Sequence, residues 1–201
     1  MERGCGNGAL LAGCQAPPTY KSGESYVTVA KDPRRDTQRA REENEQAIKL
    51  MEQRKWSETE PVLKRALEAD VTFGPAHNNL GKVYYQQSQL YLAAWEFQYA
   101  IKLMPTQAEP KNNLGLVLES AGKLDEAIEQ FQQAVAMNPD MIEWIANSTR
   151  ARWHRGDRDS GLRASLETIV LRDIRPEWVK WARAQLVLFP LPSTTTSSES
   201  P

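Results

Sequence analysis

The sequence repeats itself every 34 residues, and this internal repeat constrains the fold more than any other feature. Residues 74–105 recur at 108–139. The two copies match in their apolar and small residues, which are Leu80 and Leu114, Gly81 and Gly115, Phe97 and Phe131, Ala100 and Ala134, and Pro105 and Pro139. A period of this length is typical of helix-turn-helix units that bury their apolar faces only by stacking. The sequence therefore predicts an all-α fold, an α-solenoid.

The repeated residue types suit two helices packed closely together. Gly81 and Gly115 allow a second helix to approach, and the phenyl rings of Phe97 and Phe131 fill the space that small residues leave. Proline after each second helix ends that helix, because it lacks the backbone N–H and disfavours helical geometry in the residue before it.

Weaker units flank the two clear ones. The repeats are expected at about 40–73, 74–107, 108–141 and 142–175, followed by a closing helix at 176–189. The last unit departs from the strict register, and a slip of one residue is one interpretation. In the closing helix, apolar residues that start at Trp178 share one face, which suits a cap over the exposed end of the stack.

The two ends of the chain differ from the helical body at 38–189. Residues 15–37 contain Pro17, Pro18 and Pro33 among polar residues, which predicts a flexible linker. Residues 190–201 are rich in Ser, Thr and Pro, which predicts a disordered tail.

Composition disfavours several classes of function. The formal net charge is −1, and the chain holds only two histidines and two cysteines, Cys5 and Cys14. No apolar run is long enough for a transmembrane helix, and no catalytic or phosphate-binding motif is present. We expect no enzyme activity, no cofactor, no metal site and no small-molecule substrate.

The pattern of Leu-Gly and Tyr on a first helix, then Ala, Phe and Ala on a second and a closing Pro, resembles the tetratricopeptide repeat (TPR) family. The resemblance covers most of the chain, although only the second and third repeats carry the full pattern. It implies a concave groove, formed by the first helices of the repeats, that binds a peptide or helix of a partner protein.

Stepping along the sequence by 34 residues predicts which side chains line this groove. The candidate partner-binding residues are Asn44, Ile48, Asn78, Lys82, Tyr85, Asn112, Leu116 and Arg150. A carboxamide donates and accepts hydrogen bonds, so an asparagine row can pair with a peptide backbone. The alternative is a structural role, which is stronger for the neighbouring column of Asn79, Asn113 and Asn147. The columns lack the carboxylate clamp of chaperone-binding relatives, and we expect an amphipathic or weakly acidic ligand.

The amino terminus resembles a bacterial lipobox at Leu11-Ala12-Gly13-Cys14, although the apolar stretch before it is short. This resemblance implies that residues 1–14 are a truncated lipoprotein signal and that Cys14 carries a lipid. A chain anchored in this way would lie in the bacterial cell envelope and face the periplasm. The alternative is a soluble cytoplasmic adaptor.

Two further groups of residues have competing interpretations. The basic segment from Arg150 to Arg163 includes Trp153 and could hold nucleic acid, although Asp157 and Asp159 lie within it. His77 is expected to cap or pack near the start of its helix. The six tryptophans are expected to pack in the core or between repeats.

Overall fold

The computed structural model describes residues 35–189, which form nine α-helices and contain no β-strand. The helices are α1 (Thr37–Glu52), α2 (Trp56–Ala69), α3 (Gly74–Gln86), α4 (Leu90–Leu103), α5 (Glu109–Ser120), α6 (Leu124–Met137), α7 (Ile142–Arg155), α8 (Ser160–Arg172) and α9 (Pro176–Leu186). The fold is therefore an all-α helical repeat, as the 34-residue period predicts.

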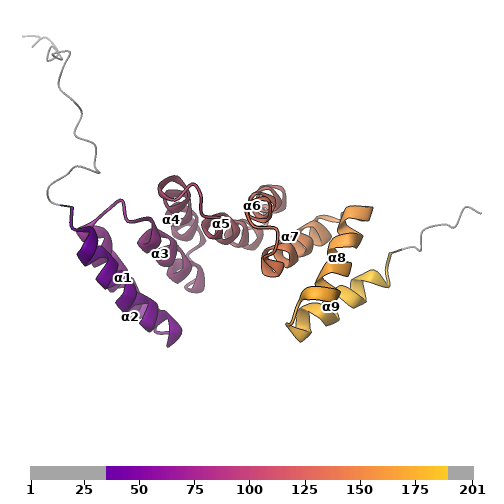
Figure 1. Cartoon of the computed structure of the whole chain (residues 1–201), viewed down its shortest axis with the longest axis horizontal. Coiled ribbons are helices and arrows are strands. Elements are labelled where there is room, and N and C mark those ends of the chain that lie inside the picture. The colour runs from indigo at the N-terminus through magenta and orange to yellow at the C-terminus, as the bar shows by residue number, and fades with distance from the viewer. Residues whose placement is uncertain (1–34, 190–201) are drawn as a thin grey trace, which may run out of the picture. The chain divides into compact units, whose positions relative to one another are not determined.

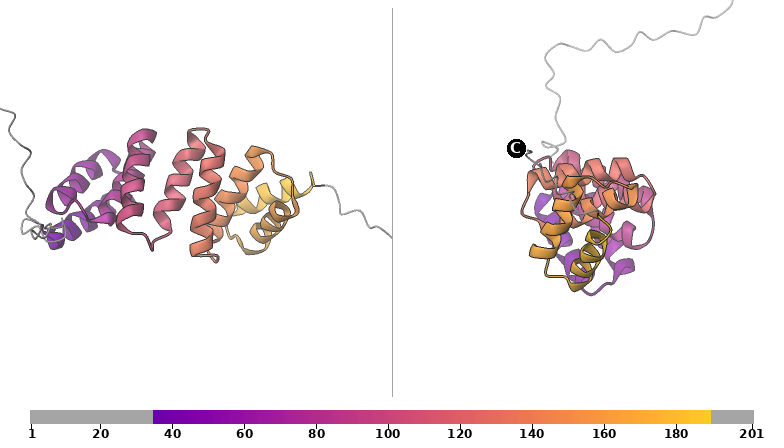
Figure 2. Two further views of the ribbon diagram at one scale, coloured as in Figure 1. Left: turned by 90° about the horizontal axis from the view of Figure 1, so that it is seen from above. Right: turned by 90° about the vertical axis from the view of Figure 1, so that its right-hand side faces the viewer.

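Consecutive helices pack as antiparallel pairs, and the pairs stack one after another (Figures 1 and 2). The odd-numbered helices also contact one another in order, α1 with α3, α3 with α5 and α5 with α7. These helices form one continuous layer, and α2, α4 and α6 lie outside it.

Glycines set the spacing inside the two central pairs. A Cβ atom on Gly81 would lie 2.7 Å from a ring carbon of Phe97, and one on Gly115 would lie 2.6 Å from the same atom of Phe131. Both rings are almost fully buried. Each ring therefore packs directly on the backbone of the first helix, which only glycine permits here.

The fourth pair keeps the register in α7 and loses it in α8. Asn147 Nδ2 donates to Asn112 Oδ1, and these residues are 35 apart, as in the preceding repeats. In α8 the buried side chains are Leu162, Leu166 and Ile169, each one position beyond the place that the 34-residue step gives. The one-residue slip therefore lies in α8 alone. It follows the turn at Gly156, whose φ of 101° is in the left-handed region that favours glycine.

Helix α9 covers the end of the stack. Ala182 in α9, and Phe189 just after the end of α9, are buried against the apolar side chains of α8. The Phe189 ring lies 6.0 Å from the Trp153 ring. Trp178 and Trp181 pack partly on the same cluster.

None of the helices in residues 35–189 is long and apolar enough to cross a membrane. The linker up to Arg34, with Cys14, and the tail at 190–201 lie outside the described residues.

Candidate partner-binding groove

A cavity of 710 Å³ lies against the inner helices of the first three repeats. Its floor comes from α1 and α3, and its far wall comes from the end of α4 and the start of α5. The lining residues are Asn44, Ile48, Met51, Glu52, Pro75, Asn78, Asn79, Lys82, Leu103, Met104, Pro105, Thr106, Gln107, Glu109 and Pro110. We call this cavity the main groove. It combines apolar side chains with carboxamides, two carboxylates and one lysine.

The asparagines join one repeat to the next. Asn79 Nδ2 donates to Asn44 Oδ1 at 2.9 Å, Asn113 Nδ2 donates to Asn78 Oδ1 at 3.0 Å, and Asn147 Nδ2 donates to Asn112 Oδ1 at 3.0 Å. In each step, the second asparagine of one repeat bonds to the first asparagine of the preceding repeat. We call these bonds the asparagine ladder. Both predicted columns therefore have a structural role, because the carboxamide oxygens of the first column are already bonded.

Lys82 is paired within the main groove. Its Nζ contacts Glu109 Oε1, and Asn78 Nδ2 also donates to this oxygen at 3.4 Å. Burial alone would raise the pKa of Glu109, but the hydrogen bond and positive charge of Lys82, helped by Asn78, lower it below its usual value. Glu109 therefore stays ionised, and much of the charge of Lys82 is neutralised by it.

A smaller hollow of 200 Å³ continues the groove between α3 and α5. Lys82 borders both cavities, and Tyr85 and Leu116 line this one with Met51 and Trp56. The hydroxyl of Tyr85 lies 3.1 Å from the Ser120 hydroxyl, which connects the second repeat to the third.

Arg150 lies farther along the stack and is held by a carboxylate. Its Nε and Nη2 donate to the two oxygens of Glu119 at 2.8 and 2.6 Å, and its guanidinium stacks on the Trp178 ring at 5.0 Å. It borders a separate hollow of 150 Å³ with Glu177, Trp178 and Trp181. Because α7 keeps its register, Arg150 stays on the inner face.

The structure places seven of the eight predicted groove residues along three hollows and leaves Asn112 outside them. Asn44, Ile48, Asn78 and Lys82 line the main groove, Tyr85 and Leu116 line its continuation, and Arg150 borders the third hollow. Asn112 is only 3% exposed and lines none of these described hollows.

Sequence reasoning missed the far wall of the main groove. This wall is formed by residues 103–107, Glu109 and Pro110, which belong to the connection between α4 and α5. Reading only the first helices of each repeat cannot find it. Pro105 was the available signal, because a proline that redirects the chain also places the connection beside the inner layer.

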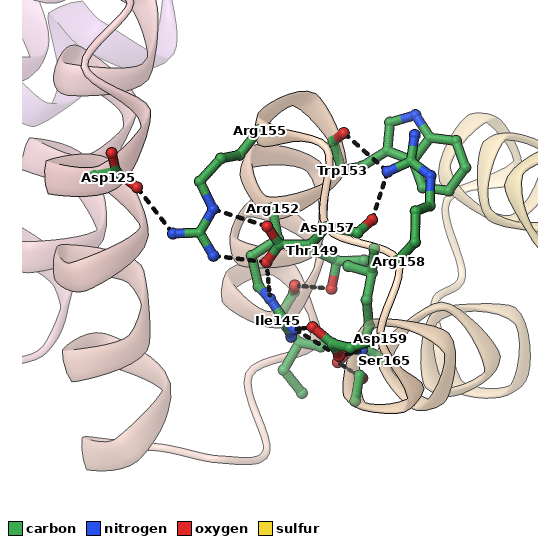
Figure 3. Close-up of polar contacts among 12 residues, drawn as sticks. Asp125, Ile145, Thr149, Arg152, Trp153, Arg155, Asp157, Arg158, Asp159 and Ser165 are labelled. Atoms are coloured by element: carbon green, nitrogen blue, oxygen red, sulfur yellow. Dashed lines mark hydrogen bonds and ion pairs between the residues drawn. The ribbon is translucent and has the colours of Figure 1, made fainter.

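Carboxylates pair with Arg152 and Arg155 of the basic segment, as Figure 3 shows. Arg152 pairs with Asp157 and Asp159, and Arg155 pairs with Asp157 and Asp125. Arg158 stacks on the Trp153 ring at 3.5 Å. Since these cations already have partners, the geometry does not favour a nucleic-acid site here.

His77 is buried as the sequence predicts, whereas Trp95 is more exposed than the sequence predicts. His77 is buried, and its ring nitrogens lie 2.6 Å from Glu96 Oε2 and 2.9 Å from the Val71 carbonyl. It therefore packs near the start of α3, as expected. Trp95 is 49% exposed, so the expectation that every tryptophan packs in the core or between repeats is wrong for this one.

No group of three or more His, Cys, Asp or Glu side chains within residues 35–189 is arranged to hold a metal ion.

Comparison with known proteins identifies the repeat. Residues 108–141 match the family model of the tetratricopeptide repeat. A search of curated protein sequences finds no match to the chain.

Solved structures share the fold. PilF of Pseudomonas aeruginosa is 19% identical with a TM-score of 0.67, over 75% of this chain and 68% of that one. The first TPR domain of Spaghetti (RPAP3), solved with an HSP90 peptide, is 17% identical with a TM-score of 0.60, over 63% of this chain and 100% of that one. The O-GlcNAc transferase of Thermobaculum terrenum is 21% identical with a TM-score of 0.62, over 73% of this chain and 27% of that one. Residues 108–141 are therefore a tetratricopeptide repeat, and the described residues share the all-α helical repeat fold of these structures.

Proposed function

We propose that this chain is a non-catalytic scaffold that binds a peptide or helix of a partner protein in the main groove. The observation that carries the proposal is the 710 Å³ cavity, which lies open against the inner helices of three repeats. A TPR fold supports a role in protein–protein interaction, and the Spaghetti (RPAP3) domain was solved with a bound peptide.

The charges of the main groove favour a particular ligand. Lys82 is paired with Glu109, whereas Glu52 also lines the groove and is exposed. The apolar part of the lining comes from Ile48, Met104 and their neighbours. We therefore favour an apolar segment that carries a basic residue. The sequence leads us to expect an amphipathic or weakly acidic ligand. Of these two we favour the amphipathic one, because both cations, Lys82 and Arg150, are held by carboxylates.

Selection from a random peptide library tests this function. Peptides selected on the full chain should lose at least tenfold in affinity for the Ile48→Glu variant, because a carboxylate would replace an apolar part of the groove wall. The matched control is Gln46→Glu, which adds a carboxylate at an exposed position of α1 that does not line the groove. Equal binding to both variants would contradict the proposal.

We also propose that Cys14 is lipidated and anchors the chain to a bacterial envelope membrane, with the repeats facing the periplasm. The support is the sequence Leu11-Ala12-Gly13-Cys14, followed by a proline-containing segment that can hold a domain away from a bilayer. A cysteine that carries two or more acyl chains anchors a protein stably to a membrane. A single acyl chain gives only weak, reversible membrane binding.

Membrane fractionation in a bacterial host tests the anchor. The wild-type chain should sediment with membranes, and Cys14→Ala should move to the soluble fraction. Cys5→Ala is the control and should behave as wild type. A wild-type chain found in the soluble fraction would instead support a cytoplasmic adaptor.

A further inference from the structure

Another hollow, of 280 Å³, lies where the fourth repeat departs from the preceding ones. It opens between α6, α7 and α8 and shares no lining residue with the main groove. We call it the fourth-repeat hollow. Its lining residues are Gln132, Val135, Ala136, Ile145, Ser148, Thr149, Arg152 and Ser165.

Small or polar residues line this hollow at positions where the repeat carries large side chains. Three of them are Ser148, Arg152 and Ser165. In the second and third repeats, the matched residues 34 and 68 positions earlier are Leu80 and Leu114, Tyr84 and Leu118, and Phe97 and Phe131. The side chains that fill the core of the preceding repeats are therefore replaced here by smaller or polar ones.

Thr149 explains why a phenyl ring of the chain does not fill the hollow. It takes the position of Gly115, on which the Phe131 ring packs in the third repeat. A Cβ atom on Gly115 would lie 2.6 Å from that ring, so a ring placed in the same way would collide with a threonine. Ser165 stands at the matched position of α8, and the space beside Ser148 is left open.

The hydroxyl of Ser148 is available to a ligand. Ser148 is only 9% exposed, and it lines the hollow. In the same two helices, the hydroxyls of Thr149, Ser165 and Thr168 donate to the carbonyl four residues back, at 2.7, 3.0 and 2.9 Å, whereas the Ser148 hydroxyl has no hydrogen bond to any group within residues 35–189. Since buried polar groups are normally hydrogen-bonded, this hydroxyl can donate to a molecule in the hollow or accept from it.

The charges around the hollow favour an uncharged ligand. Among the described residues that line it, Arg152 is the only charged one, and its guanidinium is held by Asp157 at 3.1 Å and by Asp159 at 2.7 Å (Figure 3). An ionic ligand would lose its hydration and meet a cation that already has partners. Val135 and Ile145 supply an apolar wall. The hollow therefore combines an apolar wall with a hydroxyl that can hydrogen-bond.

The volume suits a single aromatic ring. An apolar cavity of about 150 Å³ is enough to bind benzene, and the fourth-repeat hollow has 280 Å³. In the second repeat, Tyr84 stands at the position of Arg152, and it is buried. The chain thus buries a phenol ring of its own at the matched position two repeats earlier.

We propose that the fourth-repeat hollow binds a phenol ring, with the ring against Val135 and Ile145 and its hydroxyl hydrogen-bonded to Ser148. A free phenolic compound and a tyrosine side chain of a partner protein both supply this chemistry. Because the hollow and the main groove have no lining residue in common, this site does not depend on the proposed binding of a segment in the main groove.

Titration of the ¹⁵N-labelled full chain with p-cresol, which has the structure of a tyrosine side chain, tests the site. The amide signals of Ile145, Ser148 and Ser165 should shift and saturate. N-acetyl-tyrosine amide then distinguishes the two sources of the ring. Saturable shifts at the same signals would assign the site to a tyrosine of a protein, and their absence beside p-cresol binding would assign it to a free phenol. No saturable shifts with p-cresol would overturn the proposal.

Ser148→Ala tests the hydrogen bond, because it keeps the space and removes the hydroxyl. The variant should bind p-cresol about fivefold more weakly, which is the loss expected for one hydrogen bond. Toluene, which lacks the hydroxyl, should bind the variant as well as it binds the wild-type chain. An equal change for the two compounds would contradict the assigned contact.

Ser148→Leu tests the space, because leucine is the residue at the matched positions of the second and third repeats. Filling the hollow should weaken p-cresol binding at least tenfold, and the variant should unfold at the wild-type temperature or above. Ser57→Leu is the matched control, since it adds the same side chain at an exposed position of α2, and it should bind p-cresol as the wild-type chain does. Undiminished binding by Ser148→Leu would overturn the proposal.

Discussion

Gly115 decides how closely the two helices of the third repeat approach. The Phe131 ring occupies the place where a side chain at Gly115 would begin, with 2.6 Å between the ring carbon and an added Cβ. Sequence periodicity predicts this pair, because the same glycine and phenylalanine recur in the second repeat.

The Gly115→Ala variant tests this packing. We expect it to lower the free energy of unfolding by about 1–3 kcal/mol, since the phenyl ring must move in a closely packed core. Urea denaturation measures the change. Phe131→Leu, which shortens the ring side chain, should make the added methyl group less costly, and the two substitutions should therefore be non-additive. Purely additive losses would contradict direct contact between these two positions.

The asparagine ladder shows where residue-level prediction stops. The sequence reveals two asparagine columns, but it does not reveal that they bond to each other. The bonds join different columns of successive repeats, 35 residues apart, and depend on how one pair of helices is rotated on the next. That rotation is a property of packing.

Replacing ladder residues singly and together tests the ladder. Asn112→Leu should lower the free energy of unfolding by about 1–3 kcal/mol, because Asn147 Nδ2 would be buried without an acceptor. Adding Asn147→Leu should recover part of this loss, since two apolar groups leave no unpaired donor. A double variant that loses the sum of both single changes would argue against the bond. Chemical denaturation of the four proteins in the cycle supplies the measurement.

At the scale of elements, the turn between α7 and α8 is held by charge. The hydrogen bond from Arg155 lowers the pKa of Asp157 from 3.8 to about 2, partial burial opposes this shift, and Arg152 adds to it (Figure 3). This turn precedes the helix α8, in which the buried residues are slipped by one position. The sequence alone does not decide the register of α8, because its apolar residues fit more than one register. The burial of Leu162, Leu166 and Ile169 in the structure selects one register.

The lowered pKa predicts how stability depends on pH. Because the pKa of Asp157 is lower in the folded chain than in the unfolded chain, its stabilising contribution is complete above about pH 4 and is lost as the pH falls towards 2. Asp157→Asn should therefore reduce stability by about 1–2 kcal/mol at pH 6, after allowance for solvent screening. The difference from wild type should shrink towards pH 2.

Thermal unfolding of both proteins across pH 2–6 measures this dependence. Asp125→Asn is the control, because Asp125 pairs with Arg155 but its side chain is 86% exposed. It should change stability much less. A loss at Asp157→Asn that is the same at pH 2 and pH 6 would contradict the role of its charge.

For the molecule as a whole, the sequence predicts the helical repeat and the inner face, but not the shape of the main groove. The inner helices recur with the period, so their exposed residues can be read in columns. The far wall comes from the connection between α4 and α5, and the pairing of Lys82 with Glu109 crosses from one repeat to the next. The preference for a ligand with a basic residue follows from this pairing of Lys82 with Glu109. It could not be predicted from the sequence of one helix, because the two residues belong to different helices.

Chemical-shift mapping with a peptide selected on the full chain tests the central claim, that the main groove binds a partner segment. Titration of the ¹⁵N-labelled chain should shift the amide signals of Ile48, Asn78, Lys82 and Gln107 most, because these residues line the cavity from α1, α3 and the α4–α5 connection. Largest shifts in α8 and α9, or no saturable shifts around α1, α3 and the α4–α5 connection, would contradict the account.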